Sequence, residues 1–96
     1  MPWLTIHSID GWSNRYELLG KEVLIGRLPS CNIQIGYDRQ DVSRRHARLR
    51  KVDDVWQIED MRSRNHTSVN GEILTPGRPK ALRHGDRIRI CSYEIF

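Results

Sequence analysis

Two short clusters of polar residues, Gly26-Arg27 and Ser43-Arg44-Arg45-His46, stand at the two ends of one segment of the chain. Arginine forms forked, charge-assisted hydrogen bonds with phosphate or carboxylate oxygens, and a serine hydroxyl adds another donor. Together the clusters could bind a tetrahedral oxyanion. Each also has a plainer interpretation, as a surface arginine beside a turn glycine and as a basic turn that leads into a strand. For His46 we favour a buried, structural role that holds two loops together.

A third group of polar residues lies between positions 60 and 71. Asn65 could pair through its amide with the N–H and C=O groups of an extended peptide. Asn70-Gly71 is the residue pair most typical of a tight hairpin turn. Ser43, His46 and Asp60 also supply the residue types of a hydrolase triad. No Gly-x-Ser-x-Gly turn presents the serine, however, and we expect that the chain is not an enzyme.

The rest of the chain favours short β-strands, and no window keeps the apolar spacing of a helix. The stretch from 26 to 47 contains one short predicted strand, so most of it is loop, as is typical of a binding site on a rigid scaffold. We therefore predict one all-β domain over residues 1–96, a sandwich or a barrel. The predicted strands are 3–9, 15–19, 22–25, 33–35, 47–52, 55–59, 67–69, 72–74, 87–90 and 93–96.

Composition narrows the function classes without choosing among them. The chain has 96 residues and a net charge of +4, with 38% hydrophobic and 29% charged residues, as in ordinary globular proteins. It has no apolar run long enough to span a membrane and no secretory signal, and we expect Cys31 and Cys91 to be reduced. Its histidines and cysteines lack paired metal-ligand spacing, so we expect no metal or other cofactor.

The positive charge favours an anionic partner, which could be a nucleic acid, an acidic protein or a phosphorylated peptide. A basic run from Arg44 to Lys51 and a second pair, Arg87 and Arg89, keep nucleic-acid binding open as an alternative. No aromatic residue interleaves the basic strand, although a platform for single strands would use such residues for stacking.

The order Gly26-Arg27, then Ser43-Arg44-x-His46, then Ser63-x-Asn65 and Val69-Asn70-Gly71 resembles the forkhead-associated (FHA) domain. Residues 82–86, Leu-Arg-His-Gly-Asp, look like the Leu-x-x-Gly-Asp strand entry of the same family. The resemblance implies a β-sandwich of about eleven short, mainly antiparallel strands. It also implies that loops at one end bind a phosphothreonine peptide made by a Ser/Thr kinase. A protein interaction domain that does not depend on phosphate is the alternative.

The resemblance further implies a role for individual residues. Arg27 would contact the phosphate and Ser43 would donate its hydroxyl to a phosphate oxygen. Arg44 would be a second phosphate contact or a peptide contact, Arg64 falls at another phosphate-contact position, and Asn65 would bind the peptide backbone. The residues expected to support the site are Gly26, His46, Asn70 and Gly71.

Two positions depart from the family pattern, because His66 and Arg62 stand where glycine is common. If position 66 requires a positive φ, histidine there costs about 1 kcal/mol, which a folded domain tolerates. His66 and Asp41 are the positions we expect to influence peptide selectivity, although Asp41 could equally cap a turn. We expect a cytoplasmic location, or a nuclear one in a eukaryote, with no membrane contact and no oligomer implied.

Overall fold

The computed structural model describes residues 3–9, 11–36 and 41–96, and these residues form eleven strands. In chain order the strands are β1 (Trp3–Ser8), β2 (Ser13–Glu17), β3 (Glu22–Gly26), β4 (Ile33–Gln34), β5 (Ala47–Val52), β6 (Val55–Asp60), β7 (Ser68–Val69), β8 (Glu72–Ile73), β9 (Lys80–Ala81), β10 (Ile88–Ile90) and β11 (Tyr93–Ile95). The described part of the chain contains no helix, and hence none long and apolar enough to cross a membrane.

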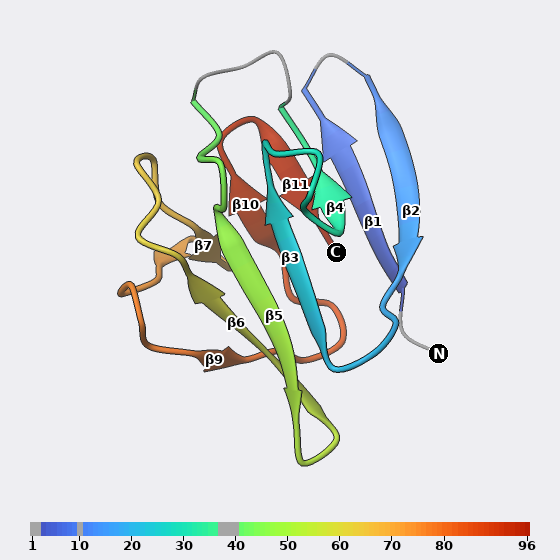
Figure 1. Ribbon diagram of the computed structural model, residues 1–96, viewed down its shortest axis with the longest axis vertical. Coiled ribbons are helices and arrows are strands. Elements are labelled where there is room, and N and C mark those ends of the chain that lie inside the picture. Colours follow the sequence, from blue (N-terminus) through green and yellow to red (C-terminus); the bar gives the residue numbers. More distant parts are fainter. Residues whose placement is uncertain (1–2, 10, 37–40) are drawn as a thin grey trace.

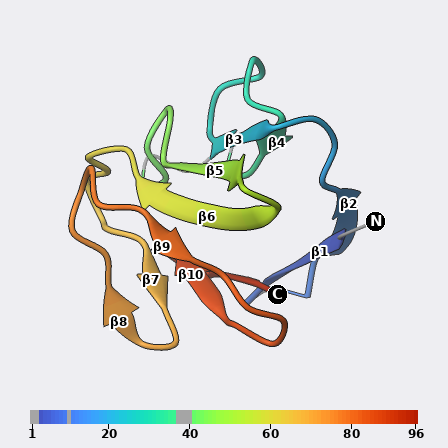
Figure 2. The same ribbon diagram turned by 90° about the horizontal axis from the view of Figure 1, so that it is seen from below.

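The strands form two sheets that face each other as a β-sandwich (Figures 1 and 2). One sheet has the order β2-β1-β11-β10-β7-β8, and the other has the order β4-β3-β5-β6-β9. Neighbouring strands are antiparallel, except for β3 and β4, which run parallel. The predicted sandwich of about eleven mainly antiparallel strands is therefore confirmed.

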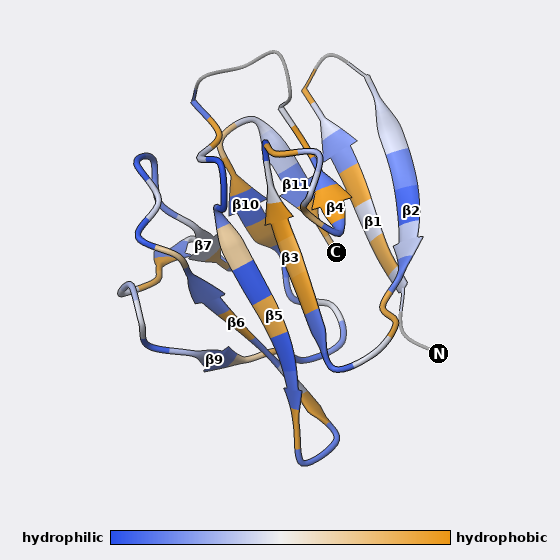
Figure 3. Ribbon diagram, viewed as in Figure 1, coloured by the Kyte–Doolittle hydropathy of each residue, from blue (hydrophilic) through white to orange (hydrophobic). Residues whose placement is uncertain are grey.

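The core forms because apolar and polar side chains alternate along the strands. In β5, Ala47 and Leu49 are fully buried between the sheets, whereas Arg50 is exposed. Figure 3 shows this alternation of hydrophobic and hydrophilic residues along β5. In β10, Ile88 and Ile90 point inward on either side of the exposed Arg89. Each such aliphatic side chain stabilises the fold by about 1.5–3 kcal/mol when buried.

Two hairpin turns, one of them the predicted Asn70-Gly71 turn, have the backbone that a tight two-residue connection requires. Asn70 and Gly71 both have positive φ, 52° and 84°, and they join the paired strands β7 and β8. Asp53 and Asp54, with φ of 51° and 64°, join β5 to β6 in the same way. Positive φ at both central residues gives the turn a twist that matches the flanking strands.

Asn70 also ties its hairpin to a neighbouring turn, which the sequence did not indicate. Its Oδ1 accepts the backbone N–H of Arg87 at 2.9 Å, and its Nδ2 donates to Asp86 Oδ1 at 3.0 Å. Asp86 Oδ2 in turn accepts the N–H of Arg83 at 2.8 Å, which closes the turn before β10. The bond from Arg83 and then that from Asn70 lower the pKa of the Asp86 carboxyl.

Most predicted strands match the observed ones to within one residue at each end, and two differences are larger. The strand predicted at 15–19 lies at 13–17. It ends before Leu18 and Leu19, of which the first is buried and the second is exposed. Strand β9 was not predicted, since Lys80–Ala81 contains no β-branched or aromatic residue. It forms because it pairs with the edge of β6.

We predict that Asn70→Ala lowers the free energy of unfolding by about 2 kcal/mol, as measured by urea denaturation. Alanine loses both side-chain hydrogen bonds and has to adopt a positive φ. Asn70→Gly is the matched control, because glycine adopts that φ freely and loses only the hydrogen bonds. Equal stability of the alanine variant and the wild type would contradict this role for Asn70.

Candidate functional site

Strand register brings three loops to one edge of the five-stranded sheet. Ile25, at the end of β3, is opposite Ala47, at the start of β5, and Ala47 is opposite Asp60, at the end of β6. The segments that follow Gly26, precede Ala47 and follow Asp60 therefore leave the sheet together. In Figure 1 they lie at the upper end of β3, β5 and β6, opposite the β5–β6 hairpin.

Gly26 allows the first two loops to approach closely. A Cβ atom at this position would lie 2.2 Å from the carbonyl oxygen of Arg44, so any side chain would collide with backbone. Beyond Gly26 the two loops are joined by hydrogen bonds from Arg27 N to Ser43 O (3.1 Å) and from Leu28 N to Arg44 O (3.3 Å). The predicted supporting role of Gly26 thus has a steric cause in this fold.

The Arg27 side chain is fixed at its base and open at its tip. Its Nε donates to the carbonyl oxygen of Val42 at 3.0 Å, across the gap between the two loops. Val42 itself is fully buried in the core, so the acceptor does not move freely. No hydrogen bond joins the two Nη groups to the described residues, which leaves their four N–H donors for a ligand.

His46 is fully buried and connects the second loop to the third. Its Nδ1 accepts the N–H of Ser43 at 3.0 Å, and its Nε2 donates to the carbonyl oxygen of His66 at 2.8 Å. These partners require the neutral ring with the proton on Nε2. Burial is the main cause that lowers the pKa of His46, and the ring stays neutral at physiological pH.

Ser43 and Asn65 complete the contact between the second and third loops. Ser43 Oγ accepts the backbone N–H of Arg64 at 2.9 Å, and its own hydroxyl proton remains to be donated. The Asn65 Nδ2 donates to the carbonyl oxygen of Asp41 at 2.8 Å. The side chains of Arg44, Arg64 and Asn65 are exposed. The structure thus gathers the five residues expected to bind the peptide at one end of the sandwich.

Asp60 supports the third loop from below, a role that the sequence interpretation missed. Its carboxylate is buried and accepts hydrogen bonds from the N–H and hydroxyl of Ser63 and from the hydroxyl of Thr67. An aspartate followed closely by a serine is typical of a loop closed by side-chain to backbone bonds, so this signal was present in the sequence. Val42 carried no such signal, because its contact to Arg27 uses a backbone carbonyl.

The third loop contains two residues with left-handed backbone. Arg62 has a φ of 57° and His66 has a φ of 70°. The positive φ considered for position 66 is thus present in the structure. Both residues are exposed.

Asp41 faces the third loop with its backbone. Its carbonyl oxygen accepts both the Asn65 amide and the Cys91 thiol, the latter at 3.2 Å. Its carboxylate Oδ1 is buried and has no hydrogen-bond partner among the described residues. Residues 37–40, which precede it, lie outside the described ranges. Whether Asp41 caps a turn or selects a peptide residue therefore stays a prediction.

The candidate triad is not assembled. Both nitrogens of His46 are bonded to backbone groups, so neither can take a proton from the Ser43 hydroxyl. Asp60 binds Ser63 and Thr67 rather than the imidazole. A histidine held in this way can brace two loops but cannot act as a general base.

The basic run and the cysteines also have structural partners. Arg48 is paired with Glu59 and lies 3.9 Å from Glu22, so part of the positive charge on β5 is neutralised within the sheet. Cys31 and Cys91 form no disulfide. Burial raises the pKa of the Cys31 thiol, which donates to the Arg44 carbonyl oxygen at 3.3 Å.

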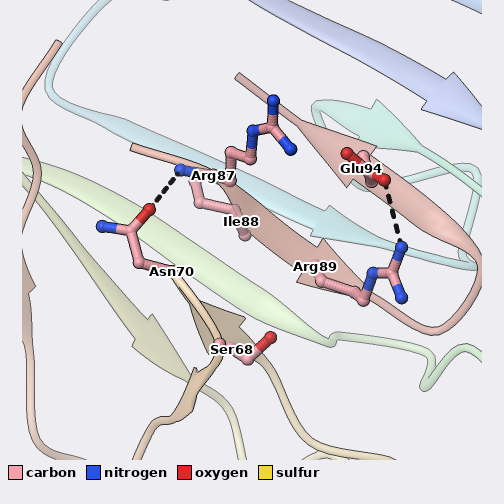
Figure 4. Close-up of a pocket in the computed structure, with 7 residues that line it drawn as sticks. Ser68, Asn70, Arg87, Ile88, Arg89 and Glu94 are labelled. Atoms are coloured by element: carbon pink, nitrogen blue, oxygen red, sulfur yellow. Dashed lines mark hydrogen bonds and ion pairs between the residues drawn. The ribbon is translucent and has the colours of Figure 1, made fainter. Parts of the chain in front are cut away.

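Figure 4 shows a hollow on the outer face of the six-stranded sheet, lined by residues that include Ser68, Asn70, Arg87, Arg89 and Glu94. Arg89 and Glu94 form an ion pair across it at 3.0 Å. None of the residues expected to bind the phosphate lines this hollow.

A family model described as the FHA domain matches residues 23–91, a range that includes all three loops. The chain belongs to the FHA domain family. It is 34% identical over 82 residues to an oxoglutarate dehydrogenase inhibitor from Corynebacterium jeikeium, which covers 85% of this chain and 54% of that protein. It is 47% identical over 62 residues to the protein FraH from Nostoc sp., covering 65% of this chain and 22% of FraH. The chain thus spans about half, or less, of the length of these relatives.

Solved FHA structures superpose over nearly the whole chain. One, from a study of phosphothreonine-dependent FHA domain interactions, is 30% identical with a TM-score of 0.79 and covers 99% of this chain and 94% of that one. The FhaA FHA domain, complexed with the intracellular domain of Rv3910, is 30% identical with a TM-score of 0.80 and covers 97% of both chains. Mycobacterium tuberculosis EmbR, in complex with a low affinity phosphopeptide, is 33% identical with a TM-score of 0.79, over 97% of this chain and 23% of EmbR.

We predict that Gly26→Ala lowers the free energy of unfolding by about 3 kcal/mol, because the new methyl group collides with the Arg44 carbonyl. Gly20→Ala is the control: a Cβ there meets nothing within 4 Å, so only the positive φ is disfavoured and the loss is about 1 kcal/mol. Thermal or urea unfolding measures both. Similar losses in the two variants would show that the close approach at Gly26 is unimportant.

We predict that His46 makes the fold less stable in acid. Its pKa is lowered in the folded state, whereas the unfolded chain has the usual value of about 6.5, so the unfolded state binds the proton more readily. This contribution to the free energy of unfolding is complete above about pH 6.5 and is lost as the pH falls below that value. The loss amounts to at most about 1 kcal/mol at pH 5.5. Urea unfolding of His46→Gln between pH 5.5 and 7.5 should lack this part of the pH dependence. An unchanged dependence in the variant would assign the effect to other groups.

Proposed function

We propose that this chain is a phosphothreonine-dependent protein interaction module, which binds a phosphorylated segment of a partner protein at the loop edge of its five-stranded sheet. The observation that carries the proposal is the position of the Ser43 hydroxyl. It is held between two loops by the N–H of Arg64, while the Arg27 guanidinium is fixed to the same segment through Val42. These contacts support a site in which hydroxyl and guanidinium donors lie on adjoining segments.

These donors suit a phosphate monoester. A phosphothreonine carries about −1.5 to −2 charges at neutral pH and presents three strong acceptor oxygens. Arg27 would bind the phosphate with its two Nη groups, Ser43 would donate its hydroxyl, and Arg64 would supply a second guanidinium. Arg44, exposed beside Ser43, would add a further contact to the phosphate or the peptide.

Asn65 would hold the peptide beside the phosphothreonine. Its Nδ2 is bonded to Asp41, which orients the amide and leaves Oδ1 free of hydrogen bonds to the described residues. An amide oxygen of this kind can accept a backbone N–H from an extended peptide. Gly26 and His46 would act indirectly, by holding the loops in place, and Asn70-Gly71 would act only through the hairpin.

The comparisons support the same function. FHA structures that superpose on the chain include one from work on phosphothreonine-dependent interactions and one bound to a phosphopeptide. The natural partner would be a protein modified by a Ser/Thr kinase. Because the chain spans about half of the oxoglutarate dehydrogenase inhibitor, we extend the proposal to phosphopeptide binding and not to that protein's target. A cytoplasmic location, or a nuclear one in a eukaryote, belongs to the same proposal.

We predict that calorimetric titration with a phosphothreonine peptide shows binding about 100-fold tighter than with the matching threonine peptide, because several charge-assisted hydrogen bonds depend on the phosphate. Arg27→Ala and Ser43→Ala should each weaken binding about tenfold or more, with little change in the unfolding midpoint. Arg50→Ala, which removes an exposed arginine on β5 outside the three loops, is the control and should bind as the wild type does. Equal binding of the two peptides by the wild type would overturn the proposal. Retention on DNA without phosphopeptide binding would favour the nucleic-acid alternative.

A further inference from the structure

Arg62 adopts a backbone conformation that its side chain disfavours. Its φ is 57°, and the neighbours on both sides hold it there. Met61 N donates to the carbonyl oxygen of His46 at 3.0 Å, and Ser63 N donates to Asp60 Oδ2 at 2.9 Å. The third loop therefore imposes the left-handed conformation at position 62, whichever residue occupies it.

Glycine would adopt this conformation without a steric penalty, whereas an arginine Cβ approaches the following carbonyl oxygen. Strained residues of this kind are found where their side chains serve a function, and Arg62 lies two residues before Arg64 in the same loop.

The Arg62 guanidinium has no partner in the described part of the chain. It forms no hydrogen bond or ion pair there, whereas Arg48, Lys51 and Arg89 are each paired with a carboxylate. The nearest carboxylate in sequence, Asp60, is buried and directed to Ser63 and Thr67. Arg62 is exposed, and it lies two residues before Arg64, one of the residues expected to contact the phosphate.

We propose that Arg62 determines specificity by binding a carboxylate of the ligand, so that the domain prefers phosphothreonine peptides with an acidic residue close to the phosphothreonine. This inference rests on the proposed phosphopeptide function. The Cα atoms of residues 62 and 64 are separated by at most about 7.6 Å, and an extended peptide advances about 3.4 Å per residue. An acidic side chain within about two residues of the phosphothreonine would therefore reach Arg62 while Arg64 contacts the phosphate.

The test compares three phosphothreonine peptides of equal length, with neutral flanks, with glutamate two residues before the phosphothreonine, or with glutamate two residues after it. We expect the wild type to bind one glutamate peptide about fivefold more tightly than the neutral peptide. Arg62→Gly should remove this preference and bind the neutral peptide almost unchanged. It should also melt about 4 °C higher, because the strained backbone is relieved. Arg62→Lys keeps the charge and should keep part of the preference.

Two control variants separate the effect of the Arg62 side chain from the effects of backbone strain and of total positive charge. Asp54→Gly relieves a similar φ of 64° in the β5–β6 hairpin at the opposite end of the sheet, so it should raise the melting temperature and leave the preference unchanged. Arg50→Ala removes one exposed positive charge from β5 and should also keep the preference. Equal binding of all three peptides by the wild type, or a preference that persists in Arg62→Gly, would overturn this inference alone. Failure of the wild type to bind any phosphopeptide would overturn the proposed function instead.

Discussion

The site depends on one buried imidazole that is bonded at both nitrogens. His46 receives the N–H of Ser43 and gives its own proton to the carbonyl of His66, so one ring fixes the spacing between two loops. Its backbone is held as firmly, because His46 N donates to Ile25 O and His46 O accepts Met61 N. A single residue is thus bonded to the end of β3, from which the first loop leaves, and to both other loops, and this keeps the basic, solvent-facing surface in order.

The five-stranded sheet places the loops, and the six-stranded sheet supplies the opposite wall of the core. Ile25, Ala47 and Asp60 are aligned by antiparallel pairing, in which a slip of one residue would turn Leu49 and Ile58 out of the core. The register that buries these side chains is therefore the same register that brings Arg27, Ser43 and Arg64 to one edge. Stability and the geometry of the site have a common origin here.

Most of the fold could be predicted from the sequence, because alternating patterns such as Ala47 to Val52 and turn pairs such as Asn70-Gly71 have direct physical causes. The grouping of Arg27 with Ser43 followed from the FHA resemblance, and the structure explains it through Gly26. Contacts that use backbone atoms could not be predicted. The carbonyls of Val42, Asp41 and His66 position three functional side chains, yet any residue has a carbonyl, so these positions carry no signal. Strand β9 was missed because neither Lys80 nor Ala81 is a β-branched or aromatic residue.

The absence of a side chain at Gly26 has a consequence for how this surface can diversify. The Arg44 carbonyl already occupies the volume of a Cβ, so the first two loops cannot move closer together, and their hydrogen bonds keep them from moving apart. The backbone spacing of these two loops is therefore fixed, and a new ligand preference has to arise by exchanging outward-facing side chains on an unchanged backbone. On such a surface the exposed side chains can be replaced one at a time while the spacing between their backbone positions is preserved.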